Sequence, residues 1–153
     1  YENLCTLPRA FAAGKATAAS NVPDVLSRLS DPGFDAAGEV FLSPASRIPT
    51  TRGEAESKGH VEIMSYAPNV VVLRSTMEES GYVVLLDRFD PNWQATIDGR
   101  EVEVIRANQI FRAVYCDAGQ HEIRFSYHQR GLRAGLTISL ATLILLAALY
   151  FKR

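Results

Sequence analysis

Five residues in the second half of the chain have side chains that could contact a ligand or a partner: Trp93, Asn108, Arg112, Asp87 and Asp90. Tryptophan rings stack on sugar faces, and the Asn and Arg side chains can hydrogen-bond vicinal hydroxyl groups. Paired carboxylates catalyse glycosyl chemistry only at a controlled separation. A structural interpretation stays open beside each of these roles: a sheet corner for Trp93, a left-handed turn for Asn108, and a turn cap with a surface charge for the two aspartates.

The remaining polar residues indicate no catalytic, metal or cofactor site. His60, His121 and His128 show no metal-ligand spacing with cysteine or carboxylate residues, and no glycine-rich phosphate loop is present. The net charge of −1 gives no indication of a nucleic-acid surface. We therefore expect no catalytic residue, no metal, no cofactor and no nucleic-acid partner.

The two cysteines, Cys5 and Cys116, allow two interpretations. They form a disulfide if the domain lies outside the cytoplasm, or they are two buried thiols that behave as small apolar residues. The spacing does not decide between them.

The stretch DPNWQATIDGREVEV predicts two turns with a strand between them. In the first turn, Pro91 presets the backbone and Asn92 tolerates the second turn position. Asp98-Gly99 then predicts a type I′ hairpin, because both central residues of that turn need positive φ. The single tryptophan, Trp93, lies between the two turns.

The rest of the first 129 residues predicts an all-β fold, a jelly-roll-like β-sandwich with one short N-terminal helix near residues 23–30. Alternating apolar residues separated by Gly, Pro and Asp breaks indicate the strands. Residues 82–88 are apolar through their first five positions and predict a central strand, and residues 43–59 predict a mobile loop. The expected strands are residues 7–15, 39–43, 60–66, 69–76, 82–88, 93–97, 101–107, 111–116 and 121–127.

The C-terminal segment predicts a membrane-spanning helix over residues 130–153. Ala134 to Phe151 contains no charged residue. A helix over this stretch is about 27 Å long, close to the hydrocarbon thickness of a bilayer. Tyr150 and Phe151 suit an interfacial aromatic belt, and Lys152-Arg153 follow. The chain thus divides into a β domain, 1–129, and a lipid-contacting helix, 130–153.

Several motifs in a fixed order resemble the C-terminal region of the YfhO-like family of bacterial membrane proteins. The family pattern has a Tyr-Pro-Gly-Trp-Lys-Ala segment, an Asp-Gly hairpin, Ala-Asn-x-x-Phe-Arg-Ala-Val, and Ala-Gly-x-His-x-Val-x-Phe-x-Tyr before a membrane helix. Two departures are Asp90, where an aromatic residue is usual, and Asn92, which replaces a glycine. The matching residues here are Asp90 to Ala95, Asp98-Gly99, Ala107-Asn108, Phe111 to Val114, Ala118-Gly119 and His121 to Tyr127.

This resemblance implies a function for a longer parent protein. Family members resemble multi-pass glycosyltransferases that take sugar from a polyprenyl-phosphate donor and act on cell-envelope polymers. Their catalytic carboxylate lies among early membrane helices, which this chain does not contain. The resemblance therefore implies a non-catalytic, extracytoplasmic C-terminal domain at the bacterial cell membrane, with Lys152-Arg153 in the cytoplasm. Its partners would be the bilayer and the transmembrane part of the parent.

Two alternatives stay open. The domain could be a carbohydrate-binding module that holds an acceptor polysaccharide of the cell envelope. It could also be a single-pass, membrane-anchored structural or interaction protein. The presence of upstream membrane spans would separate the last alternative from the others, and saccharide binding would identify the carbohydrate-binding module.

Overall fold

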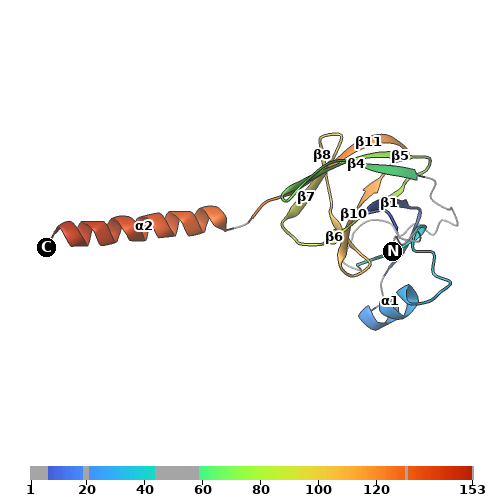
Figure 1. Ribbon diagram of the computed structural model, residues 1–153, viewed down its shortest axis with the longest axis horizontal. Coiled ribbons are helices and arrows are strands. Elements are labelled where there is room, and N and C mark those ends of the chain that lie inside the picture. The colour runs from blue at the N-terminus through green and yellow to red at the C-terminus, as the bar shows by residue number, and fades with distance from the viewer. Residues whose placement is uncertain (1–6, 19–20, 44–58, 130, 153) are drawn as a thin grey trace, which may run out of the picture.

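The computed structural model describes residues 7–18, 21–43, 59–129 and 131–152. In these residues it shows eleven strands in two sheets and two helices, so the predicted all-β domain with a short N-terminal helix is confirmed at the level of a two-sheet β fold. Figure 1 shows the sheets in one body, from which the C-terminal helix extends.

The first sheet has six strands, in the spatial order β1-β6-β10-β9-β3-β2. Its members are β1 (Ala10–Ala13), β2 (Lys15–Ala18), β3 (Glu39–Leu42), β6 (Gly81–Arg88), β9 (Ile105–Ala107) and β10 (Phe111–Cys116). β2 and β3 run parallel, which an all-antiparallel jelly roll does not include.

The second sheet has five strands, in the order β4-β5-β11-β7-β8, and all its pairs are antiparallel. Its members are β4 (Gly59–Ala67), β5 (Val70–Met77), β7 (Trp93–Ile97), β8 (Arg100–Val102) and β11 (Gly119–Tyr127).

The main core lies between the two sheets. Side chains from β1, β6 and β10 pack against side chains from β5, β7 and β11, as in a β-sandwich. On β11, buried Ile123 and Phe125 alternate with exposed Glu122 and Arg124. The prediction that one face of this strand contacts solvent is therefore confirmed.

A second core lies on the other face of the six-stranded sheet. It joins apolar side chains of β1, β2, β3, β6, β9 and β10, and β2 also contacts β6. β1 and β2 are the two edges of this sheet, yet only Gly14 separates them in the sequence. The sheet therefore curls around its own apolar face. Since β6 is buried on both faces, Tyr82 to Leu85 are all inaccessible, and the predicted central strand is confirmed.

The helix α1 (Val22–Leu29) lies one residue earlier than the predicted range of 23–30. The side chain of Asn21 caps it by accepting a 2.8 Å hydrogen bond from the backbone N–H of Asp24, and Pro23 occupies its first turn. Val25 is buried against Phe41 of β3. Burial of this one apolar stripe fixes the helix on the sheet.

One predicted strand is wrong. Residues 101–107 form two short strands, β8 and β9, in different sheets. The chain crosses from one sheet to the other at Glu103-Val104, which an alternating pattern cannot reveal. The predicted strand over residues 7–15 is likewise shorter, since β1 ends at Ala13 and β2 begins after Gly14.

The predicted type I′ hairpin is supported by its backbone. Asp98 and Gly99 have φ values of 50° and 79°, and Ile97 pairs with Arg100 across the turn. Both central residues thus lie in the left-handed region that this turn requires.

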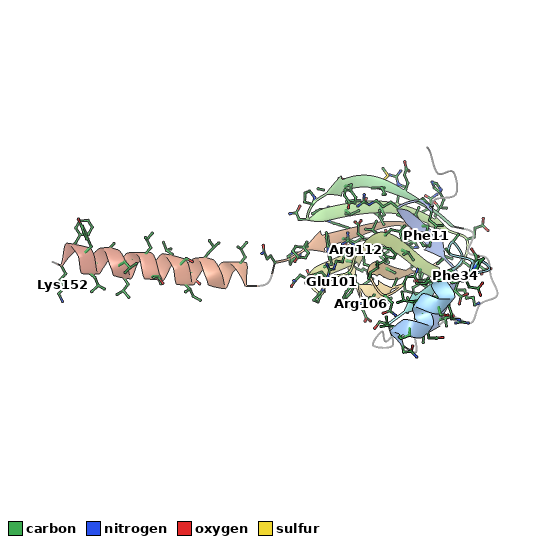
Figure 2. All side chains as sticks on the ribbon, turned by 60° about the horizontal axis from the view of Figure 1, so that its bottom comes forward. Phe11, Phe34, Glu101, Arg106, Arg112 and Lys152 are labelled. Atoms are coloured by element: carbon green, nitrogen blue, oxygen red, sulfur yellow. The ribbon has the colours of Figure 1, made fainter. Side chains whose placement is uncertain are left out.

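The helix α2 (Leu132–Phe151) occupies the place of the predicted membrane segment and extends away from the sandwich, with Lys152 at its distal end (Figures 1 and 2). In the described part of the chain, no helix combines the length and the apolar character that crossing a membrane requires. The predicted membrane span over residues 130–153 is therefore not supported.

Strand directions give the sandwich two ends. The near end, beside the start of α2, holds the β4–β5, β6–β7 and β9–β10 connections and the end of β11. The far end holds the β5–β6, β7–β8 and β10–β11 turns.

Most of the predicted mobile loop, residues 44–58, lies outside the described residues, as does Cys5. Cys116 is a buried free thiol.

Candidate functional site

A shallow depression at the near end brings together three of the five predicted contact residues, Asp87, Trp93 and Arg112. Its volume is about 290 Å³. The other lining residues are Tyr66, Ala67, Pro68, Val71 and Arg88.

Strand alternation places the Arg112 side chain between the two sheets. On β10 it shares a face with Val114 and Cys116, which are part of the core. A register shift between Phe111 and Arg112 leaves extra residues on β6 at this point, and such a bulge re-aims the side chains beside it. Asp87 of β6 thereby comes within 2.9 Å of the Arg112 guanidinium. Figure 2 shows Arg112 inside the body of the sandwich.

Arg112 is 2% exposed, so its charge must be compensated within the protein. Its guanidinium donates to Asp87 Oδ2 at 2.9 Å and to the carbonyl oxygen of Arg88 at 3.5 Å, while Nε has no partner. The same group lies 3.7 Å from the centre of the Trp93 ring and 5.3 Å from that of Phe125. Burial lowers the pKa of Arg112, and the charge of Asp87 opposes that shift.

Asp87 is the centre of the polar cluster. Its Oδ1 accepts hydrogen bonds from Arg9 Nε at 3.0 Å and Nη2 at 2.7 Å. Its Oδ2 accepts from Tyr66 Oη and from Arg112 Nη2, both at 2.9 Å. The carboxylate thus ties together the segment before β1, the end of β4, and strands β6 and β10.

Arg9 and Tyr66 were not expected at this site from the sequence. The Arg9 guanidinium donates to Tyr66 Oη at 2.6 Å and lies 4.4 Å from the centre of the Tyr66 ring. Burial raises the pKa of Tyr66, as does its hydrogen bond to Asp87. Arg9 is 78 positions from Asp87 in the sequence, so no local sequence pattern predicts the contact.

Trp93 packs at the corner between the β6–β7 turn and β7. Its ring meets the Tyr127 ring edge-on, with 5.2 Å between centroids, and the Arg112 guanidinium lies over it. It packs against the main core and is partly buried. Since the guanidinium covers one face of the ring, that face has no room for a sugar.

The structure places Asp90 and Asn108 outside this depression. Asp90 Oδ1 accepts a 2.8 Å hydrogen bond from the backbone N–H of Asn92, which caps the turn before Trp93. Asn108 has a φ of 45° and is buried. Its backbone N–H and side-chain oxygen bond the carbonyl and the N–H of Phe41, at 2.7 and 2.8 Å. In both places the polar side chain accepts a hydrogen bond from a backbone N–H group.

A different depression, at the far end, was not predicted. It measures about 410 Å³ and contains a 2.7 Å pair between His121 Nδ1 and Asp98 Oδ2. The hydrogen bond to Asp98 raises the pKa of His121, and the hydrogen bond from His121 lowers the pKa of Asp98. The other lining residues are Ile97, Arg100, Val102, Tyr115 and Asp117.

The chemistry available at the near end is limited. Asp87 is the only carboxylate that lines the depression in the described part of the chain, and it is occupied by three donor side chains. A second carboxylate at a defined separation, which glycosyl chemistry requires, is not among the lining residues. Nor do the described residues contain a group of three or more His, Cys, Asp or Glu residues that could hold a metal ion.

The fold and the near-end cluster define a two-sheet β domain whose sheets are joined by a buried arginine. The family model "Bacterial membrane protein YfhO" matches residues 56–139, more than half of the chain, and the chain belongs to this family. The match extends through all strands from β4 to β11 and into α2. Neither a curated protein nor a solved structure matches the chain.

Proposed function

We propose that the chain is a non-catalytic, extracytoplasmic domain of a longer YfhO-family membrane protein, divided into a β domain, 1–129, and a membrane-attaching segment, 130–153. The parent, as the family resemblance implies, is a glycosyltransferase that takes sugar from a polyprenyl-phosphate donor and modifies cell-envelope polymers. The β domain would act as an accessory to the transmembrane part.

The observation that carries the proposal is the apolar surface of α2. Its described large apolar side chains are all exposed, from Leu132 at 52% to Phe151 at 84%. The helix extends away from the sandwich in Figures 1 and 2. So large an apolar surface marks contact with a membrane or with another protein, and the family is one of bacterial membrane proteins.

The polar clusters support a structural role for the β domain. The cations and the hydroxyl around Asp87 are bound to it, and Arg112 also covers one face of Trp93. These contacts favour an accessory domain over a carbohydrate-binding module, because Arg112 occupies a ring face on which a sugar would stack.

Membrane attachment is tested by placing charges on α2. The full chain, expressed in bacteria, should stay in the membrane fraction after carbonate extraction. Leu143→Arg together with Ile144→Arg should release it, because charged side chains are costly inside a bilayer. Val22→Arg with Leu26→Arg is the matched control, since these side chains on α1 are 52% and 53% exposed. Extraction of the unchanged chain by carbonate would contradict the proposal.

The side of the membrane is tested by thiol labelling in a Cys5→Ser background. Glu78→Cys, on the exposed β5–β6 turn, should react in intact cells with a reagent that does not cross membranes, while Cys116 is buried. Labelling that requires cell lysis would place the domain in the cytoplasm. The non-catalytic role predicts that Asp98→Asn in the full-length parent leaves the transfer rate per folded molecule unchanged.

A further inference from the structure

A small cleft at the near end has not been assigned a role above. It measures about 190 Å³ and is lined by residues of the β6–β7 and β9–β10 connections. We call these residues the basic tip: Arg88, Phe89, Arg106, Gln109 and Ile110.

The basic tip lies at the end of the sandwich from which α2 departs. The N–H of Phe89 donates to the carbonyl of Ile110 at 2.7 Å, which joins the two connections. Three residues after Phe89, the carbonyl of Asn92 accepts a 3.0 Å hydrogen bond from the N–H of His128, in the segment that leads to α2. The tip and the start of α2 therefore share one end of the domain.

The charge of the basic tip is uncompensated in the described part of the chain. Arg88 and Arg106 are exposed, and neither forms a salt bridge with a described acidic side chain. The carboxylates nearest to Arg88 in the sequence are engaged elsewhere, Asp87 with Arg9, Tyr66 and Arg112, and Asp90 with the N–H of Asn92. Glu103, the carboxylate nearest to Arg106 in the sequence, forms no salt bridge with it.

The apolar part of the basic tip is held outward. Ile110 is 58% exposed, although a large aliphatic side chain gains most from burial. The residues before it, Asn108 and Gln109, have φ values of 45° and 69°, and the two hydrogen bonds between Asn108 and Phe41, one donated by each residue, fix this turn. Arg106 lies over the Phe89 ring at 4.8 Å. The turn thus presents an isoleucine beside two arginines.

We propose that the basic tip rests on the membrane surface, with Ile110 among the lipid headgroups and Arg88 and Arg106 bound to the phosphates of anionic lipids. An exposed apolar side chain flanked by two guanidinium groups that form no salt bridge with a described carboxylate suits that boundary. Guanidinium matches phosphate geometry, and the surface of an anionic leaflet attracts basic residues. The inference rests on the proposed function, since it requires α2 to bring this end to the bilayer.

The test uses the full chain reconstituted in vesicles of phosphatidylcholine or of phosphatidylcholine with phosphatidylglycerol. In a Cys5→Ser background, an environment-sensitive fluorophore is attached to one of three variants: Ile110→Cys at the tip, Leu145→Cys on α2, or Glu79→Cys on the far-end turn. Nitroxide-labelled lipids should quench the fluorophore at positions 110 and 145 but not at 79. Quenching at 110 should be stronger in the anionic vesicles.

Removing the two charges tests the headgroup contact. Arg88→Gln with Arg106→Gln should abolish the difference between the two vesicle types at position 110. Arg74→Gln with Arg124→Gln, a matched pair on the exposed face of β5 and β11, should leave it intact.

The remaining outcomes separate the two claims. Quenching at 145 without quenching at 110 would overturn the inference and leave the proposed function standing. No quenching at either position would contradict membrane attachment itself. The emission of the fluorophore at 110 could also indicate equal shielding from water in both vesicle types, with and without the two arginines. That result would indicate that the tip contacts protein, and it would overturn the assignment to lipid.

Discussion

The two ends of the sandwich use the same kind of interaction, a cation paired with an aspartate, in opposite settings. At the near end the side chains of Arg112 and Asp87 are 3% and 10% exposed, whereas those of His121 and Asp98 at the far end are 19% and 51% exposed. A buried charge that loses its partner is costly, whereas an exposed pair contributes little. Burial, more than distance, decides what each pair does for the fold.

The pairs also differ in what they join. Arg112 connects Asp87 on one sheet to Trp93 and Phe125 on the other. The His121–Asp98 pair stays within the five-stranded sheet and holds the β7–β8 hairpin to β11. The near-end cluster therefore fixes how the two sheets pack on each other. The far-end pair only holds the β7–β8 hairpin in place within its own sheet. The four predictions below test this difference.

The largest effect is expected from Asp87→Asn. The substitution removes the charge that compensates buried Arg112, and breaking such a buried pair costs about 3–5 kcal/mol. Denaturant unfolding of the full chain in detergent would measure the loss. Asp90→Asn is the control, because asparagine can cap the same turn, and its cost should stay below about 0.5 kcal/mol. Equal effects of the two substitutions would refute the special role of the near-end cluster.

Trp93→Ala should come next, at about 3 kcal/mol, because it removes a large aromatic side chain from the corner between the sheets. Trp93→Phe should cost less, since it keeps a ring under the Arg112 guanidinium. Trp93 is the only tryptophan, so its emission reports this site alone. The emission should not respond to added saccharides, and quenching by a sugar would favour the carbohydrate-binding alternative.

Gly99→Val, at the far end, should cost on the order of 1 kcal/mol, because φ at this position is positive and a β-branched residue resists it. A Cβ atom here would meet no neighbour within 4 Å, so the cost isolates backbone strain. Gly99→Asn should lower the melting temperature less, as asparagine tolerates the left-handed region. An unchanged melting temperature for the valine variant would contradict the type I′ turn.

The smallest effect is expected from the pH dependence of the His121–Asp98 pair. The raised pKa of His121 means that its contribution is complete below the ordinary histidine pKa and is lost as pH rises through the raised value. The lowered pKa of Asp98 means that its contribution is present above the ordinary aspartate pKa and is lost as pH falls through the lowered value.

The pair should therefore stabilise the hairpin most between about pH 4 and pH 6.5. Near the upper boundary of this range the unchanged chain should lose stability as pH rises, because the imidazolium deprotonates. His121→Gln should remove this decrease, so that the melting temperature of the variant changes little with pH there. A wild-type profile that rises with pH through neutrality would contradict the assigned direction of the histidine shift.

Local chemistry made much of the fold predictable. The Asp98-Gly99 turn, the Asn21-capped helix and the strand over residues 93–97 depend on neighbours in sequence, and each forms where expected. The crossing at Glu103-Val104 was missed because an alternating pattern reports which face of a strand is apolar, and it contains no information about which sheet the strand joins.

The candidate site was predictable only in part, for the same reason. Asp87, Trp93 and Arg112 do meet, yet their partners Arg9 and Tyr66 come from segments 78 and 21 positions away from Asp87. One indication was present in the sequence: Arg112 falls on the same side of its strand as Val114 and Cys116, so alternation already placed it toward the core.

The bend at Gly14, which joins the two edges of the six-stranded sheet, has a consequence for folding during synthesis. Chains emerge from the ribosome N-terminus first, but among the described strands β1 pairs only with β6, whose residues lie far downstream. Until β6 emerges, β1 has an unpaired backbone and unburied Ala10 to Ala13. Contacts so distant in sequence form slowly. We therefore expect closure of the curled sheet to be a late event, and a ribosome-bound chain that stops before residue 81 should remain sensitive to proteolysis along its first strand.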